Sequence, residues 1–493
     1  MPRRDLNQKV AVAVVYVAAM FMTILDTTIV NVALPTLGRD FHASSTALDT
    51  VVIGFLVSLA VFIPASGWLG DRFGPRRVLL TAIFMFTAAS ALCGAATSLS
   101  ELTAFRVLQG VGGGLMTPVG MTMLWRAFPP AERIRASAIL VVPTALAPAL
   151  GPVLGGLFVT DLSWRWVFLV NVPIGLLAIV FGTVFLREQP RHRVGRFDLP
   201  GFLMAGVGLG LLMYGLSEGP VKGWASTDVI ATCVSGAVLL TGLVAVELRR
   251  SDPLIALRLL RDRLFRSANI VMFCGAAAFL GMLYLAALFF QDGLGLSALG
   301  AGLTTFPEAL GVMAGAQIVT RVLYPRIGPR RIMMGGLAGV ALGMVAMSFV
   351  GDQTNLWLVR LAMLEMGISM SGVFVPTQAA AFATISLADM GGASTFFNAE
   401  RQLGGAVGVA LLTTVLSAVG VTSSVAGHVT AHLAAYHMAF LTAAAMALGG
   451  VAAAATVKDA DAANTISRRR TVAVPARQTR DKLAVPAMQA DST

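Results

Sequence analysis

The chain has 493 residues, of which 56% are hydrophobic and only 12% are charged, and its mean hydropathy is +0.79. Soluble globular chains carry about 25% charged residues, so this composition excludes a soluble protein and indicates one that lives in a membrane. The net charge of +11 does not indicate nucleic-acid binding, because the basic residues lie in short loops between apolar stretches and form no single patch.

Fourteen apolar stretches are long enough to cross a bilayer as helices. We expect these spans at residues 10–34, 47–69, 78–97, 102–125, 136–160, 166–186, 199–217, 228–247, 267–290, 298–320, 332–350, 356–380, 393–420 and 433–456. An even number of spans places both termini on one side of the membrane. Of the 36 lysines and arginines, 30 fall on that side, which the positive-inside rule identifies as the cytoplasm.

The chain repeats itself at a separation of 254 residues. The segment WLGDRFGPRRVLL, beginning at Trp68, returns as VLYPRIGPRRIMM beginning at Val322, and the same separation carries Arg106 onto Arg360. Two features that agree on one register rarely do so by chance. The spans therefore form two related halves in parallel, with spans seven and eight inserted between them. One large class of transporters has two such halves, and its substrate site lies between them near the membrane midplane.

These patterns predict an all-α polytopic membrane protein made of two six-helix bundles plus two inserted helices. We expect the N-terminal bundle in residues 1–190, the two extra helices in 191–262 and the C-terminal bundle in 263–457. Residues 458–493 are rich in Ala, Thr and Arg, so we expect a disordered cytoplasmic tail that is either solvated or in contact with anionic lipid through its arginines.

The first span contains a carboxylate. Asp26 would lie about 13 Å in from a helix end near Pro35, well inside a hydrocarbon core roughly 30 Å thick. A charge at this depth costs roughly 2.5 to 3.5 kcal/mol to insert and is typical of ion and proton pathways. Burial disfavours the charged form, so exposure to the two sides in turn could load and unload a proton. The alternative is a structural role in which Asp26 is bound to Thr27, Thr28 or Asn31.

The loop after the second span, GWLGDRFGPRR, combines glycines with an acid and several bases. Its glycines allow two spans to approach closely and to turn sharply, and Asp71 can accept hydrogen bonds from the N-terminal amides of a neighbouring helix. We therefore expect a cytoplasmic gate, with a basic loop that only fixes topology as the alternative. The candidate gate residues are Gly67, Asp71, Arg72, Gly74 and Arg76.

Arg106 lies a few residues into the fourth span, on the outer side of the membrane and far from the loops that hold most arginines. If it faces the interior of the bundle, this permanent cation needs a partner. It could control the proton affinity of an acidic residue, bind carbonyls of a broken helix, or extend to the outer surface.

The fifth span, VVPTALAPALGPVLGGLF, is rich in proline and glycine. Its prolines remove backbone donors and its glycines leave a smooth face, which predicts a kinked helix that packs tightly and acts as a hinge. The hinge residues are Pro148, Gly151, Pro152, Gly155 and Gly156.

Three further acids, Glu308, Glu365 and Glu400, lie within spans of the second half and are candidate cavity carboxylates, although Glu400 could instead form a structural ion pair with Arg401. The sequence contains no P-loop, H-E-x-x-H or G-x-S-x-G motif, and its cysteines and histidines lack metal-ligand spacing. We therefore expect no enzyme activity, no metal and no cofactor, with a proton gradient as the energy source.

The chain resembles the major facilitator superfamily, and within it the fourteen-span drug/proton antiporter branch that includes bacterial multidrug exporters. The segments that carry this resemblance are LDTTIVNVALP, GWLGDRFGPRR, RVLQGVGGG, GPVLGG, WRWVFLVNVPIG and RQLGGAVGVAL, and it extends to about residue 456. The resemblance implies the major facilitator fold and export of lipophilic, often cationic compounds in exchange for protons. It implies proton coupling by Asp26 and Arg106 and a gate at Asp71 and Arg72, but it does not extend to Glu308 or Glu365.

The hypothesis is a proton-coupled antiporter for multidrug efflux that works by alternating access in the cell membrane, with both termini in the cytoplasm. Its expected partners are a small-molecule substrate and the lipid bilayer, without nucleic acid, and we expect a monomer. An exporter of a lipid or endogenous metabolite on the same scaffold is one alternative. A non-transporting membrane sensor is another.

Overall fold

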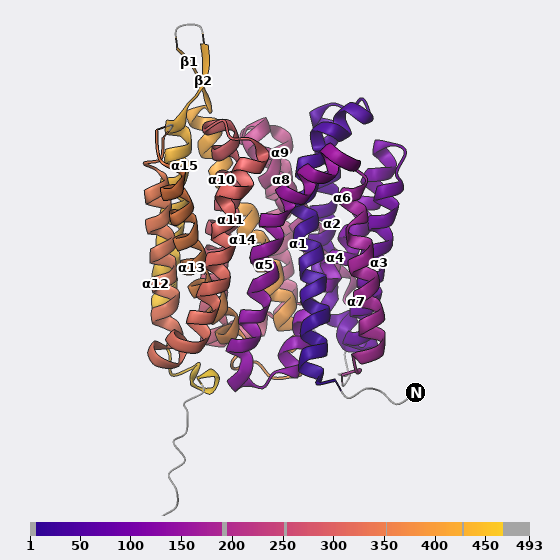
Figure 1. Cartoon of the computed structure of the whole chain (residues 1–493). Coiled ribbons are helices and arrows are strands. Elements are labelled where there is room, and N and C mark those ends of the chain that lie inside the picture. Colours follow the sequence, from indigo (N-terminus) through magenta and orange to yellow (C-terminus); the bar gives the residue numbers. More distant parts are fainter. Residues whose placement is uncertain (1–5, 190–194, 251–253, 352, 426–427, 467–493) are drawn as a thin grey trace, which may run out of the picture.

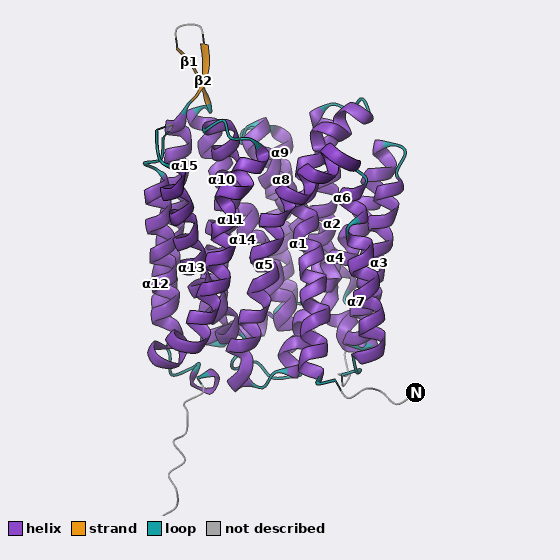
Figure 2. Cartoon of the chain, viewed as in Figure 1, coloured by secondary structure: helices purple, strands orange, loops and turns teal. Residues whose placement is uncertain are grey.

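The computed structural model describes residues 6–189, 195–250, 254–351, 353–425 and 428–466, and most of them lie in long helices that run side by side (Figure 1, Figure 2). The helices of the first half are α1 (Gln8–Asp40), α2 (Ser45–Phe73), α3 (Pro75–Ala95), α4 (Leu99–Ala127), α5 (Arg133–Leu157), the short α6 (Trp166–Leu169) and α7 (Asn171–Phe185). They are followed by α8 (Leu199–Lys222) and α9 (Thr227–Glu247). The second half comprises α10 (Arg263–Leu288), α11 (Ala298–Ile318), α12 (Tyr324–Met347), α13 (Leu356–Ala381), α14 (Met390–Val419) and α15 (Leu433–Ala455).

A two-stranded hairpin is the exception to the all-α prediction. Strands β1 (Thr422–Val425) and β2 (His428–Ala431) pair antiparallel between α14 and α15 and project from one end of the bundle (Figure 2). Each strand contains one Thr and one Val, and β-branched residues of this kind favour extended backbone. The segment is too short and polar to cross a membrane, so it interrupts no span. The start of α1 and the end of α15 both lie at the opposite end of the bundle, at the bottom of Figure 1.

The helices pack as two bundles with contacts between them. In the first half α4 packs against both α2 and α3, and α1 packs against α5, α4 and α7. In the second half α13 packs against α11 and α12, and α10 packs against α14 and α15. The halves meet where α5 contacts α11 and α13 and where α14 contacts α2 and α4. Helix α8 packs against α9 and also touches α2 and α14, so it bridges the two bundles along one side.

Twelve stretches of the described residues are helical, long and apolar enough to cross a membrane, so the chain is a multi-pass membrane protein. One of these stretches, 299–347, contains both α11 and α12. Helix α4, which carries Arg106, is not among the twelve although it is 29 residues long.

The segment after α15 is folded as far as residue 466 and contains the 3-10 helix η6 (Ala463–Thr465). The hydroxyl of Tyr324 lies 2.6 Å from that of Thr465, and Asn464 Nδ2 donates to the carbonyl of Ala383 at 2.9 Å. The disorder predicted from residue 458 is therefore wrong for residues 458–466, because their side chains find polar partners at the ends of helices, which composition does not reveal. The rest of the predicted tail, 467–493, lies outside the described residues.

Glycines hold α4 close to its two neighbours. A Cβ atom added at Gly112 would lie 2.7 Å from the backbone nitrogen of Phe86 on α3, and one added at Gly114 would overlap the carbonyl oxygen of Leu59 on α2. Helix backbones can approach this closely only where side chains are absent. The run GVGGG therefore fixes the position of α4, and with it the position of Arg106.

We predict that Gly114→Ala destabilises the protein, whereas Gly113→Ala is tolerated. The new methyl group at position 114 would meet backbone, while at position 113 it would lie 3.4 Å from the end of the Leu59 side chain, which can move. Overpacking of this kind costs about 1 to 3 kcal/mol. Thermal unfolding of the two purified variants in detergent measures the difference, and equal midpoints would contradict the packing described for α4.

Candidate functional site

Asp26 and Arg106 form an ion pair inside the first half. Asp26 is fully buried on α1, and Arg106 on α4 is 1% exposed. Arg106 Nη1 donates to Oδ2 of Asp26, and Nε donates to the carbonyl of Val51 on α2 at 3.3 Å. The guanidinium also lies over the ring of Phe55, with Cζ 4.1 Å from its centroid. Arg106 thus binds an acid and a backbone carbonyl, and this carbonyl belongs to the continuous helix α2 and not to a broken helix.

Two amide side chains complete the binding of the carboxylate. Gln109 Nε2 donates to Asp26 Oδ1 at 2.8 Å, and Asn171 Nδ2, from the start of α7, donates to the same oxygen at 3.2 Å. Both amides also donate to Ser90 Oγ on α3, at 3.1 and 3.2 Å, and Ser90 donates to the carbonyl of Phe168. We call Asp26, Arg106, Gln109, Asn171 and Ser90 the buried polar cluster. Charge-assisted bonds of this kind offset the desolvation of a buried acid.

The structural alternative for Asp26 is wrong for the neighbours considered. Thr27 donates to the carbonyl of Ile24 at 2.6 Å and Thr28 to that of Leu25 at 3.0 Å, as threonines inside helices commonly do. Asn31 is exposed, whereas Asp26 is fully buried. The partners of Asp26 instead come from helices far away in the sequence.

Three members of the buried polar cluster, Gln109, Asn171 and Ser90, were not predicted from the sequence. Gln109 lies three residues after Arg106, on the same face of α4, and this spacing could have indicated a shared site. Asn171 and Ser90 are polar residues inside apolar stretches, a weaker signal, because small polar residues often have packing roles in membrane helices.

Two of the gate residues, Gly67 and Asp71, lie where the two halves touch, at the end of the bundle that holds the start of α1 and the end of α15. Arg126 Nη2 donates to Oδ1 of Asp71 at 2.7 Å, and both side chains are largely buried, at 6% and 11% exposure. A Cβ added at Gly67 would lie 3.1 Å from the carbonyl of Gly391, and one added at Gly391 would lie 2.8 Å from Asp71 Oδ2. Asp71 is thus next to the first turn of α14, where the helix dipole favours an anion. Arg126 was not predicted.

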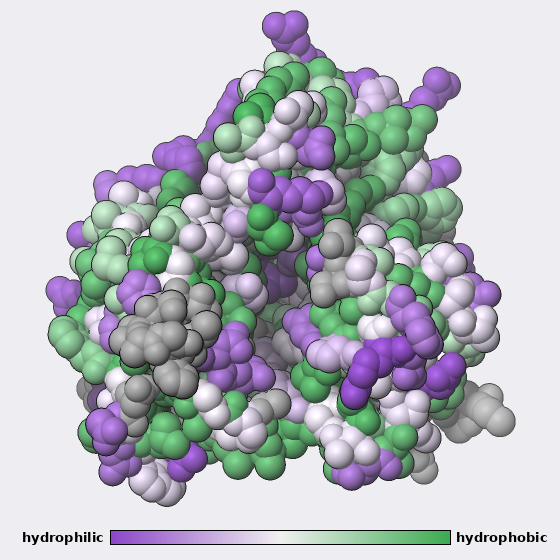
Figure 3. Space-filling model, turned by 90° about the horizontal axis from the view of Figure 1, so that it is seen from above, coloured by the Kyte–Doolittle hydropathy of each residue, from purple (hydrophilic) through white to green (hydrophobic). Residues whose placement is uncertain are grey.

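Further contacts close this end of the molecule. Arg126 Nε donates to the carbonyl of Leu387 at 3.1 Å, and Arg133 Nη1 donates to that of Phe382. The rings of Trp125 and Phe382 stack with centroids 5.1 Å apart. The opposite face, seen from the hairpin end, is hollowed at its centre (Figure 3). The structure therefore has one end sealed between the halves and a central hollow at the other, and we call these the sealed end and the open end.

The remaining gate residues anchor the turn between α2 and α3. Gly74 has a φ of 95°, which favours glycine, and Arg76 donates from its backbone nitrogen to Glu188 at 3.1 Å and from Nη2 to the carbonyl of Thr183 at 2.8 Å. Arg72 is exposed.

The second half repeats this turn. Gly328 has a φ of 77°, and the backbone nitrogen of Arg330 donates to Asp459 Oδ1 at 2.8 Å. In each half, an acid that follows the last helix of that half accepts a hydrogen bond from the first arginine of G-P-R-R. The acid is Glu188 after α7 and Asp459 after α15. The sequence repeat revealed the glycines and arginines but not their acidic partners, which lie at no common separation.

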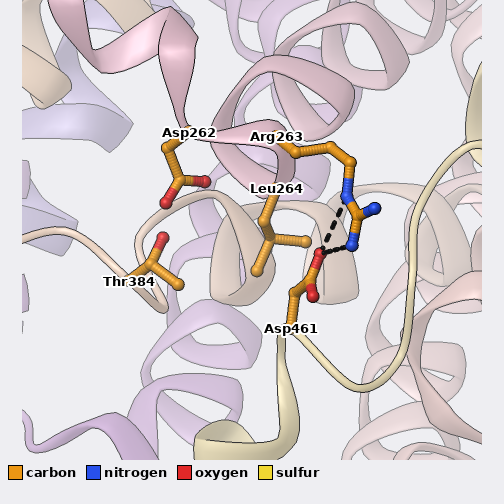
Figure 4. A pocket seen from close by; sticks show the side chains of 5 residues that line it. All are labelled: Asp262, Arg263, Leu264, Thr384 and Asp461. Carbon is orange, nitrogen blue, oxygen red and sulfur yellow. Dashed lines mark hydrogen bonds and ion pairs between the residues drawn. The ribbon is translucent and has the colours of Figure 1, made fainter.

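The segment 457–466, which we call the C-terminal strap, binds across the end of the second half. Arg263, at the start of α10, donates from Nη2 to Asp461 Oδ2 at 2.6 Å, beside a cavity of about 400 Å³ that Asp262, Leu264 and Thr384 also line (Figure 4). Within the strap, η6 contacts η1 (Pro130–Glu132) of the first half. The strap thus joins both halves at the sealed end. Its cavity lies at the helix ends and not between the halves at mid-membrane.

The predicted hinge helix α5 lies between α1 and α11. A Cβ added at Gly151 would overlap the side chain of Thr28 on α1, and one added at Gly155 would lie 3.0 Å from Val32. Pro152 lies on the other side, 3.7 Å from the position that a Cβ of Gly302 on α11 would take. Gly156 has open space around it, and Pro148 lies within the helix, which is continuous from Arg133 to Leu157. Helix α5 thus links the two halves. Its action as a hinge stays a prediction.

The three carboxylates of the second half do not lie together. Glu365 accepts a hydrogen bond from Ser369 at 2.6 Å and points toward Gly339 and Gly343 on α12. Glu308 on α11 is 5% exposed, and its Oε1 has no partner among the described residues.

Both oxygens of Glu400 on α14 are buried without a hydrogen-bond partner among the described residues, so the alternative of a hydrogen-bonded ion pair with Arg401 is not formed. The charge of Arg401 lies instead close enough to interact with both Glu400 and Tyr16 on α1. Among the described residues, Glu308 therefore has no cation near its charge, whereas Glu400 has the charge of Arg401 close by but no hydrogen bond to it.

The bundle of membrane-spanning helices, the sealed and open ends and the intramembrane ion pair define a membrane transporter. The family model described as Major Facilitator Superfamily matches residues 16–409, and the chain belongs to that superfamily. It is 33% identical over 408 residues to the multidrug resistance protein B homolog of Mycobacterium tuberculosis, covering 82% of this chain and 75% of that protein. It is also 33% identical over 422 residues to a Salmonella typhi protein that carries the name multidrug resistance protein MdtD, covering 83% and 88%.

Two solved structures share the fold. The human organic anion transporter MFSD10 has a TM-score of 0.63 at 17% identity, covering 90% of this chain and 99% of that one. The proton:xylose symporter XylE has a TM-score of 0.60 at 15% identity, covering 91% and 95%.

We predict that Arg126→Ala opens the sealed end. It leaves Asp71 buried without its cation and removes a bond to the loop before α14, and breaking a buried pair in this way costs about 3 to 5 kcal/mol. In a background without native cysteines, Thr395→Cys should react with an impermeant maleimide at this face at least about tenfold faster, since 1.4 kcal/mol corresponds to a factor of ten. Arg39→Ala, at the open end, is the control. An unchanged labelling rate in Arg126→Ala would contradict the gate.

We predict that the double variant Asp459→Asn, Asp461→Asn lowers stability by about 1 kcal/mol, because each acid makes a charge-assisted bond that is partly exposed to solvent. The matched control is Asp161→Asn, an exposed acid at the open end. Denaturation of both variants in detergent measures the difference. If the double variant is as stable as the control, the C-terminal strap contributes nothing to the fold.

Proposed function

We propose that this transporter is a proton-coupled antiporter that exports lipophilic, cationic small molecules by alternating access. One observation supports the proposal above the others: an acid and a permanent cation are paired out of reach of water, in a molecule whose one end is sealed between the halves. Intramembrane ionisable pairs are typical of proton relays. The multidrug resistance relatives support the class of substrate.

We further propose fourteen spans, formed by α1 to α5, by α6 and α7 together, and by α8 to α15, in the cell membrane with both termini in the cytoplasm. The length of α4 and the presence of two separate helices within 299–347 support this count over twelve. The distribution of lysine and arginine supports the orientation. In this orientation the sealed end is cytoplasmic and the open end faces outward.

The proposed cycle follows from the charge balance of the buried polar cluster. In the outward-open form Asp26 is a carboxylate that holds Arg106, and through it α1 holds α4. Protonation from outside would remove that attraction and favour a rearranged first half in which the cytoplasmic gate opens. Release of the proton to the cytoplasm would restore the pair. Because the two forms differ in their affinity for the proton, proton entry and substrate exit can be coupled.

Glu308 and Glu400 suit a cationic substrate, because both carry buried carboxylate oxygens without a partner among the described residues. A cation that entered between the halves could pair with either group. Both acids lie on helices that reach the first half, since α11 contacts α5 and α14 contacts α2 and α4. A substrate bound there would touch both halves.

We predict that Asp26→Asn abolishes proton-driven uptake of a cationic dye by everted membrane vesicles, because a neutral amide cannot exchange a proton. Asp228→Asn, an exposed acid outside the buried polar cluster, is the matched control and should transport like the wild type. Equal uptake by Asp26→Asn and the wild type would refute coupling through Asp26. If the wild type moves no dye but exports a labelled lipid or metabolite, the proposed substrate class is wrong while the coupling remains testable.

A further inference from the structure

Protonation of Asp26 changes which hydrogen bonds the buried polar cluster can make. The carboxylate is an acceptor only, and its partners Arg106, Gln109 and Asn171 all donate to it. A neutral carboxylic acid has one O–H donor, and this donor needs an acceptor because the site is closed to water. A buried donor without a partner costs about 1 to 3 kcal/mol.

The acceptors around Asp26 can be counted one by one. Gln109 Oε1 already accepts from Arg106 Nη1 at 2.8 Å and from the Cys93 thiol at 3.8 Å. Ser90 Oγ accepts from Gln109 and from Asn171 while donating its own proton to Phe168. A hydroxyl oxygen has two lone pairs, so both are in use.

Asn171 holds the acceptor that is left. Its Oδ1 is buried and has no hydrogen-bond partner among the described residues, although the whole residue is fully buried. Unpaired buried carbonyl oxygens are rare enough to require an explanation. The amide is turned so that its Nδ2 faces Asp26, which is the orientation that a charged carboxylate selects. Asn171 Oδ1 therefore lacks a hydrogen-bond donor only while Asp26 is charged.

We propose that Asn171 is a positioning residue whose hydrogen bond to Asp26 reverses with the protonation state of Asp26, and this inference rests on the proposed function. Asn171 donates to the carboxylate and accepts from the carboxylic acid. The exchange needs no new partner. The Asn171 amide rotates so that its Oδ1 faces Asp26 in place of its Nδ2. The bond from Nδ2 to Ser90 is kept. Asn171 and Asp26 are joined by one hydrogen bond in both states. After protonation, the new O–H of Asp26 donates to Asn171 Oδ1.

The position of Asn171 gives this exchange a route to the backbone. Asn171 is the first residue of α7, and the short α6 ends two residues earlier at Leu169. Ser90, which binds Asn171, also binds the carbonyl of Phe168 in α6. A rotation of the Asn171 amide therefore acts at the joint between α6 and α7 and not in the middle of a rigid helix.

Other groups around Asp26 do not provide the same exchange. The charged and titratable neighbours are Arg106 on α4 and the thiol of Cys93 on α3. Helix α2 contributes the carbonyl of Val51, which is bound to Arg106, and α5 meets α1 through Gly151 and Gly155. Arg106 has only donors, so it can donate to the carboxylate or to the carbonyl oxygen of the acid, but it cannot accept the new O–H.

Infrared difference spectroscopy of the full chain in liposomes tests the inference. The C=O stretch of protonated Asp26 is identified by its loss in Asp26→Asn. In Asn171→Leu, which has similar size but no acceptor, this band should shift to higher wavenumber, as it does for a carboxylic acid without a hydrogen-bond acceptor. Asn171→Thr, whose hydroxyl can accept, should return the band toward its wild-type position. The matched control is Asn269→Leu, which removes another buried asparagine with an unpaired Oδ1 and should leave the band unchanged.

The wild type provides a second measurement that does not depend on folding of a variant. With asparagine side chains isotope-labelled, an amide C=O band should shift when the pH is lowered, and the shift should be absent in Asp26→Asn and in Asn171→Leu. An Asp26 band at the same position in the wild type and Asn171→Leu, or no asparagine shift in the wild type, would overturn the inference. Transport that depends on Asp26 would survive either result, so the proposed function is judged separately by dye uptake.

Discussion

A carboxylate cannot remain charged among apolar helices unless other groups replace the water it has lost, and this constraint accounts for the arrangement of the first half of the transporter. Asp26 on α1 is bound by one cation and two amides contributed by α4 and α7, and a serine of α3 holds the amides in place. These bonds join four helices around one group. The same bonds make the site sensitive, because a single proton removes the charge that every donor is oriented toward.

Helix α4 connects this buried polar cluster to the sealed end of the molecule, where we propose the gate. It carries Arg106 toward one end and Arg126 toward the other, 20 residues and therefore about 30 Å apart along the axis. Glycines fix α4 against its neighbours, so it can transmit a displacement as a rigid element. Coupling between distant sites needs an element with two arrangements that both sites influence. A helix that pairs with Asp26 near one end and with Asp71 near the other has the connections that such an element requires.

The sequence predicted the elements better than it predicted their partners. Helices form at each of the fourteen apolar stretches, because length and apolar composition are local properties, and Asp26 and Arg106 were singled out because charge is costly inside a membrane. Their pairing, the amides that complete it, and Arg126 at the gate depend on how α1, α4 and α7 pack. The C-terminal strap was mistaken for disorder because Asp459 and Asp461 are stabilised by partners more than 120 residues away. Hairpin residues were also missed, since two short strands leave little periodic signal.

Proton release on substrate binding tests the central claim most directly. Purified wild-type protein in weakly buffered detergent, started at a pH where Asp26 is protonated, should release protons when a cationic substrate is added, and a pH-sensitive dye can count them. The account predicts release from the wild type and a loss of that release in Asp26→Asn that still binds the substrate. Equal release from both proteins would show that another group carries the proton, and the role assigned to the pair of Asp26 and Arg106 would be wrong.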